Sequence, residues 1–217
     1  MNRISLFEEG SGPKRVLALG AHADDIEIGC GGTILRLVAE QREVEILWVV
    51  FSATPERAKE ARSSADAFLE GVTKARSLVL DYRDGFLPYS GPAVKDDFEA
   101  LKSEFEPDLV LTHYREDRHQ DHRLISELTW NTWRDHLILE YEIPKYDGDF
   151  GSPNFFASLP AATLERKIEL VLKHFNSQTG RAWFTADLFR AAARIRGMEC
   201  AAPEGHAEGF YCRKARF

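Results

Sequence analysis

A cluster of one histidine and two aspartates lies near the start of the chain, in the segment GAHADDIEIGCGGTI (20–34). His22, Asp24 and Asp25 fall within four residues there, directly after the apolar run RVLALGA (15–21). Placing two acids and a histidine at the edge of a core is costly unless these groups are used. Taken alone, the Asp24–Asp25 pair is also compatible with a solvated turn.

A second cluster, richer in histidine, lies in the segment THYREDRHQDHRLI (112–125), which again follows an apolar run, DLVLTHY (108–114). It supplies His113, His119, Asp121 and His122. Taken alone, residues 119–122 also suit the charged start of a helix, where the helix dipole favours an aspartate. His113 is equally compatible with lining a site and with a buried structural role.

Together the two clusters predict a zinc site. Catalytic zinc is held by histidine nitrogens and carboxylate oxygens from three protein ligands, with one position open to water. A set of two histidines and one aspartate is available in His22, Asp25 and His122. Asp24 is then left beside the metal as a general base that takes a proton from water, while the metal polarises an amide carbonyl.

His119 and Asp121 add a second pair of groups to this chemistry. They are two residues apart, so a direct hydrogen bond between their side chains is feasible. An aspartate beside a histidine raises the histidine pKa, and a charged His119 would stabilise an oxyanion or protonate a leaving amine. With Asp24 ionised at the same time, these roles predict a bell-shaped pH profile.

The elements that position these clusters alternate regularly along the chain. Strand-like apolar segments occur at 15–21, 43–52, 75–82 and 108–114, separated by helical patterns at 31–41, 55–71 and 95–105. This alternation predicts an α/β fold, a Rossmann-like domain with a mainly parallel sheet that has these four strands at its centre and helices on its flanks. In such sheets ligands bind outside the carboxyl ends of the strands, which is where both clusters fall.

Past residue 122 the pattern is less regular. It predicts a helix at 122–136, a strand at 137–143, a loop at 144–154, helices at 160–175 and 183–197, and a final strand at 209–217. The segment 129–149 combines aromatic and polar residues with a loop. It is compatible with shaping a substrate pocket and with packing against the sheet.

Length and composition restrict the class of protein. The 217 residues suit one domain over 1–217, with a polar lead-in at 1–14. A net charge of −7 argues against a nucleic-acid partner. Three cysteines and the lack of an apolar leader or membrane-length segment predict a cytoplasmic protein. Whether it forms a homo-oligomer is left open.

The motifs HADD, GCGG and HQDH resemble those of the PIG-L / LmbE-like family of zinc-dependent N-acetylglucosaminyl deacetylases. The likeness runs from 15–21 to about residue 210, and Ala23 replaces the proline usual in the first motif. The resemblance implies the roles already inferred. By this resemblance, His22, Asp25 and His122 are the metal ligands and Asp24 is the general base. His119 stabilises the transition state or acts as an acid, and Asp121 orients it.

The resemblance also implies contacts with substrate. Arg57, in TPERAKEA, matches an arginine that contacts the sugar, although R-x-x-E on a helix is often a surface pair. Asp84, in DYRDG, matches an aspartate that binds substrate hydroxyls. Some members carry a tyrosine where this chain has Asp117, and Tyr114 is a substitute for it.

The predicted reaction is zinc-dependent hydrolysis of an N-acyl group, foremost N-acetyl, on a small amino-sugar conjugate. An alternative is a zinc amidase that acts on a non-acetyl or non-sugar amide. Fe²⁺ and Co²⁺ also suit a site of two histidines and one aspartate. A nucleotide-binding module is a weaker alternative, because GCGGTI lacks the full G-x-G-x-x-G pattern.

Overall fold

The computed structural model describes residues 14–40 and 43–216; the predicted lead-in, apart from Lys14, lies outside this range. The described residues form a seven-stranded sheet in the order β3-β2-β1-β4-β5-β7-β6. The parallel strands are β1 (Lys14–Gly20), β2 (Val44–Val50), β3 (Lys74–Val79), β4 (Leu109–His113) and β5 (Leu137–Tyr141). The antiparallel strands β6 (Phe155–Ser158) and β7 (Ala207–Cys212) extend the sheet beyond β5.

The prediction of an α/β fold with a mainly parallel sheet is confirmed, but the predicted centre of the sheet is partly wrong. β1 and β4 lie in the middle, whereas β3, from the predicted segment 75–82, is an edge strand. The predicted centre differs because the order of strands along the chain does not determine their order in the sheet. The strand β6 was not predicted.

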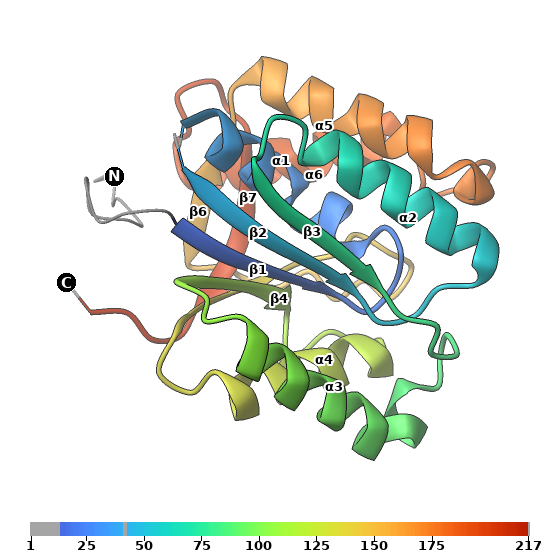
Figure 1. Cartoon of the computed structure of the whole chain (residues 1–217). Helices are drawn as coiled ribbons and strands as arrows, with labels where there is room; N and C mark the ends of the chain where they lie inside the picture. The colour runs from blue at the N-terminus through green and yellow to red at the C-terminus, as the bar shows by residue number, and fades with distance from the viewer. Residues whose placement is uncertain (1–13, 41–42, 217) are drawn as a thin grey trace.

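Helices cover both faces of the sheet (Figure 1). On one face lie α1 (Asp25–Glu40), α2 (Pro55–Phe68), α5 (Ala161–His174) and α6 (Ala186–Glu199); on the other lie α3 (Gly91–Glu104) and α4 (Gln120–Thr132). Alternate residues of the central strand β1 enter the two resulting cores. Val16 and Ala18 join one, and Leu17 and Leu19 join the other, as expected for a strand buried on both faces.

The helix α1 begins at Asp25, earlier than the predicted start near Gly31. The glycines of this segment allow close packing of the helix against its neighbours. A Cβ added at Gly29 would lie 2.1 Å from the Tyr141 ring, and one at Gly31 would lie 2.7 Å from Phe68. As a result, the two aspartates of the first motif lie at the amino end of a helix, where the dipole favours negative charge.

Helix α4 also begins earlier than predicted, at Gln120, with His119 as its N-cap. Consequently the HQDH motif forms the entry into a helix. By contrast, the predicted start of α2 is confirmed, because Thr54 caps it by accepting a hydrogen bond from the Arg57 amide at 3.3 Å.

Candidate active site

The site lies where the order of the strands reverses, between β1 and β4. From β1 the chain adds β2 and β3 on one side, and from β4 it adds β5 on the other. His22 and Asp25 follow β1, His113 ends β4, and His122 lies in the first turn of α4. Open α/β sheets bind ligands at the carboxyl ends of the strands at such a reversal, so neighbouring strands bring the two sequence clusters together.

Three side-chain atoms of the predicted ligand set form a compact triangle. His22 Nδ1 lies 3.3 Å from Asp25 Oδ2 and 3.2 Å from His122 Nε2, and the last two atoms are 3.5 Å apart. Tetrahedral zinc with ligands at roughly 2.0–2.1 Å has ligand atoms about 3.3–3.4 Å from one another. The spacing and the donor types therefore suit a zinc ion held by these three residues.

Two groups of the triangle, Asp25 and His122, are in the charge state that suits a metal. Burial would lower the pKa of His22, but nearby carboxylates, above all Asp25, raise it well above its usual value, so this ring releases a proton when a metal binds. Burial alone would raise the pKa of Asp25, but the neighbouring histidines hold it well below its usual range. Burial and the nearby His113 lower the pKa of His122 to about 4, so this ring is neutral near pH 7. A neutral imidazole and an ionised carboxylate are the forms that coordinate metal ions.

His113 is fully buried beside this triangle, with Nε2 at 3.2 Å from Asp25 Oδ2. Geometry alone would allow a ligand set of Asp25, His113 and His122. However, His113 Nε2 accepts a hydrogen bond from the backbone N–H of Ala21 at 2.9 Å, which uses the lone pair that a metal would need. Of the two roles left open by the sequence, this contact favours the structural one.

Asp117 is a functional candidate that sequence reasoning missed. Its Oδ2 is 2.9 Å from His122 Nδ1, on the opposite side of the ring from the triangle. Lys145 Nζ donates to the same oxygen at 2.9 Å and also bonds Asp149. A carboxylate behind a metal-binding histidine fixes its ring and tautomer. The available signal is an acid five residues before His122, at the position where some family members carry a tyrosine.

Part of the segment 129–149 therefore supports the site from outside. Asp149 Oδ2 accepts the Arg118 N–H at 2.8 Å, so this loop also holds the backbone just before His119. The earlier part of the segment completes α4 and forms β5, which packs within the sheet. The contacts through Lys145 and Asp149 are a role that neither of the two sequence-based alternatives included.

We expect Asp117→Asn to lower zinc affinity and kcat/KM by about 10–100-fold, since it weakens the carboxylate partner of His122. Chelator competition and steady-state kinetics would measure the two effects. Asp108→Asn is a matched control, because Asp108 Oδ2 accepts the Arg15 N–H at 2.8 Å at the opposite edge of the sheet. Unchanged zinc affinity in Asp117→Asn would show that Asp117 does not support the metal-binding role of His122.

Asp24 lies beside the triangle but is bound to another group. Arg57 Nη2 donates to its Oδ1 at 2.7 Å, and Arg57 Nη1 lies 3.0 Å from Ser177 Oγ and 3.3 Å from Glu60. Burial raises the pKa of Asp24, and the Arg57 charge opposes that rise. Arg57, predicted to contact a sugar, is thus also the partner of the predicted base, and its R-x-x-E pair is part of a half-buried network.

The predicted hydrogen bond between the side chains of His119 and Asp121 is wrong. Asp121 Oδ2 accepts the Gly85 N–H at 2.7 Å and lies 3.1 Å from His22 Nε2, while Oδ1 accepts the Leu87 N–H at 3.1 Å. Asp121 is therefore placed to orient His22. His119 Nδ1 instead accepts the backbone N–H of Asp121 at 3.3 Å, as a helix cap.

The predicted rise in the pKa of His119 is also wrong. Burial and the His22 charge lower this pKa, and together they outweigh the opposing charge of Asp121. Capping the helix requires the Nδ1 lone pair, so the His119 proton is on Nε2. The hydrogen bond differs from the predicted one because the unpaired N–H groups of the first helical turn compete for a nearby acceptor.

Of the remaining predicted substrate contacts, Asp84 is at the site. Its Oδ1 lies 3.1 Å from His22 Nε2, and its side chain is 75% exposed. Among the described residues, the Tyr114 side chain makes no hydrogen bond or ring contact with the cluster, although the Tyr114 carbonyl accepts the Asp117 N–H at 3.1 Å. Its hydroxyl donates to Glu116 at 3.0 Å, and its ring stacks on Tyr211 with centroids 4.0 Å apart.

A His/Asp cluster able to hold a metal ion, at the switch point of a mainly parallel sheet, defines the class as an α/β enzyme with a candidate mononuclear metal centre. The model of the family described as PIG-L, GlcNAc-PI de-N-acetylase, matches residues 17–133. Because this match spans more than half of the chain, the chain belongs to this family. The family resemblance and the enzyme class, a hydrolytic N-deacetylase, are thereby confirmed.

Relatives agree with this assignment. The uncharacterized deacetylase YaiS of Escherichia coli K12 is 29% identical over 189 residues, covering 78% of this chain and 95% of YaiS. The fold is similar to that of N,N'-diacetylchitobiose deacetylase from Pyrococcus horikoshii, with a TM-score of 0.72, 24% identity, and coverage of 92% of this chain and 84% of that one.

The fold is also similar to that of GalB, the 4-carboxy-2-hydroxymuconate hydratase of Pseudomonas putida KT2440. The TM-score is 0.74 at 18% identity, covering 94% of this chain and 98% of that one. A shared fold therefore does not by itself determine the substrate. Within the described residues, no helix has the length and apolar character needed to cross a membrane.

Proposed function

We propose that the chain uses zinc to hydrolyse the N-acetyl amide of a small amino-sugar conjugate, releasing acetate and a free amine. The observation that carries this proposal is the triangle of His22, Asp25 and His122. The Asp24 carboxylate interacts with the charges of this triangle but is hydrogen-bonded to Arg57 instead. A zinc ion held there supplies Lewis-acid polarisation of the amide carbonyl and acidifies water.

The chain's own residues would move the proton. Asp24 takes a proton from water while the water oxygen bonds to the acyl carbon. Asp24 then passes that proton to the leaving nitrogen as the C–N bond breaks. Arg57 holds Asp24 through one carboxylate oxygen, which leaves the other to accept the proton. His119, with its proton on Nε2, is suited to donate a hydrogen bond to the developing oxyanion.

An amino-sugar substrate is supported by the family to which the chain belongs and by the disaccharide in the name of the Pyrococcus horikoshii enzyme. The exposed Asp84 carboxylate at the site is suited to accept hydrogen bonds from sugar hydroxyls. The alternative is an amidase with the same metal chemistry that acts on a non-acetyl or non-sugar amide. A cytoplasmic location is supported by three free cysteines, Cys30, Cys200 and Cys212.

The test is acetate release from a panel of N-acetylated sugars, sugar nucleotides and sugar lipids. The protein is first stripped with a chelator and then reloaded separately with Zn²⁺, Fe²⁺ or Co²⁺. We expect acetate only from reloaded protein and only from amino-sugar amides. Comparable turnover of N-propionyl or N-acetyl amino-acid amides would favour the alternative, and turnover by stripped protein would contradict the metal-dependent reaction.

A further inference from the structure

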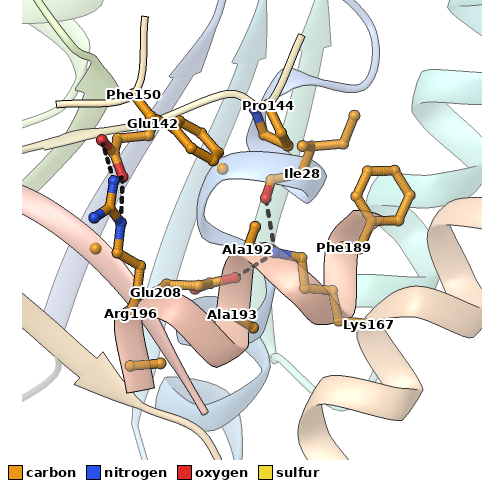
Figure 2. Close-up of a pocket in the computed structure, with 13 residues that line it drawn as sticks. Ile28, Glu142, Pro144, Phe150, Lys167, Phe189, Ala192, Ala193, Arg196 and Glu208 are labelled. Carbon is orange, nitrogen blue, oxygen red and sulfur yellow. Dashed lines mark hydrogen bonds and ion pairs between the residues drawn. The ribbon is translucent and has the colours of Figure 1, made fainter. Parts of the chain in front are cut away.

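A buried ion pair, formed by residues far along the chain from the candidate active site, contacts helix α1, which carries Asp25. Lys167 of α5 and Glu208 of β7 are each 5% exposed, and Lys167 Nζ lies 2.6 Å from Glu208 Oε1. Figure 2 shows the pair beside the backbone of α1, at one side of a cavity. A second ion pair, between Glu142 and Arg196, lines the same cavity.

The first pair occupies a single step of the α1 helix. In a regular helix the N–H of Gly32 donates to the carbonyl of Ile28. Here the Gly32 N–H donates to Glu208 Oε1 at 2.9 Å, and the Ile28 carbonyl accepts from Lys167 Nζ at 2.7 Å. The next amide, of Thr33, donates to Glu208 Oε2 at 2.7 Å.

Each charge complements the backbone group that it contacts. The Glu208 carboxylate accepts hydrogen bonds from two buried N–H groups in the middle of α1, and the Lys167 ammonium donates one to a carbonyl of the first turn. Gly32 provides the room, since a Cβ there would lie 2.9 Å from Glu208 Oε1 and 2.6 Å from Leu159. The first turn of α1 is therefore attached to α5 and β7 as well as to the rest of its own helix.

That first turn begins with Asp25, and Asp24 precedes it; the Ile28 N–H donates to the Asp24 carbonyl at 3.0 Å. We propose that Lys167 and Glu208 are positioning residues, which set the place of this turn and so of the Asp25 carboxylate relative to His122. The part of this inference that concerns turnover rests on the proposed function, whereas the part that concerns metal binding does not.

The experiment separates positioning from stability. Each single variant, Lys167→Met or Glu208→Met, leaves one buried charge without its partner, so both should lower the Tm. The double variant removes both charges and leaves the Gly32 N–H and the Ile28 carbonyl to bond each other as in a regular helix, so its Tm should recover. We nevertheless expect its zinc affinity and its kcat/KM to be lower than wild type by about 10-fold or more, as for other groups that orient metal ligands.

Zinc affinity is measured by chelator competition with zinc alone, on protein shown to be folded. The matched control is Glu142→Met with Arg196→Met, which removes the other ion pair of the cavity; neither residue bonds α1, so zinc affinity should not change. A double variant of Lys167 and Glu208 with wild-type zinc affinity would overturn the inference.

If that double variant does not fold, Gly32→Ala decides the question. It keeps both charges but crowds Leu159 and the Glu208 carboxylate, so the contact of Glu208 with the backbone must shift, and it should weaken zinc binding in the same direction. Unchanged affinity there would also overturn the inference. Failure of the wild type to release acetate would instead reject the proposed function, while the zinc measurements would still test the positioning role.

Discussion

Replacing His22 by alanine is expected to abolish zinc binding and acetate release together. His22 Nδ1 is the atom of the triangle nearest to both of the others, at 3.3 Å from Asp25 and 3.2 Å from His122. Without it, one carboxylate and one imidazole remain, which is fewer than the three protein ligands of a catalytic zinc site. Metal content by mass spectrometry and acetate release at saturating zinc would measure the two losses.

His174→Ala is the matched control for this variant. His174 is near Ser63 Oγ, at 3.0 Å, and it belongs to none of the groups that could hold a metal ion. It should therefore keep wild-type metal content and turnover. Stoichiometric zinc in His22→Ala, bound with unchanged affinity, would count decisively against the ligand assignment.

Replacing Asp24 by asparagine should leave zinc in place and lower kcat by roughly two to four orders of magnitude, the usual contribution of a general base. Asparagine keeps a side-chain oxygen that can accept from Arg57, whose Nη2 lies 2.7 Å from Asp24 Oδ1. It cannot accept a proton from water. The variant therefore changes the proton acceptor with little change in the surrounding contacts.

The measurement pairs kcat with zinc stoichiometry in Asp24→Asn and in Asp25→Asn. The second variant is the natural comparison, because Asp25 Oδ2 is an atom of the triangle and its loss should weaken metal binding. If Asp24→Asn loses metal and Asp25→Asn keeps it, the roles of the two neighbouring aspartates are the reverse of those proposed.

Much of this protein could be predicted from local sequence. The strands β1 and β4 are apolar on both faces, which indicates a parallel sheet covered by helices, and a polar cluster follows each of them. Since parallel strands end at the same edge, the convergence of His22, Asp25 and His122 follows from that pattern once the strands are neighbours. The motifs HADD and HQDH by themselves also indicate the family.

Hydrogen-bond partners were decided by the tertiary structure, because they depend on which donors compete for an acceptor. Sequence spacing put Asp121 within reach of His119, but the backbone N–H groups of Gly85 and Leu87 come from another loop and take its carboxylate. The capping demand of α4 takes the nitrogen of His119 in turn.

Long-range partners escaped sequence reasoning for the same reason. Asp117 binds His122, and the Asp117 charge is balanced by Lys145, 28 residues further along the chain. Likewise, Glu208 bonds Gly32 across 176 residues. A buried charge needs a partner, yet nothing in local periodicity says which residue will provide it. The sequence alone therefore determined which chemical groups meet at the end of the sheet, and packing between distant elements decided how each group is held.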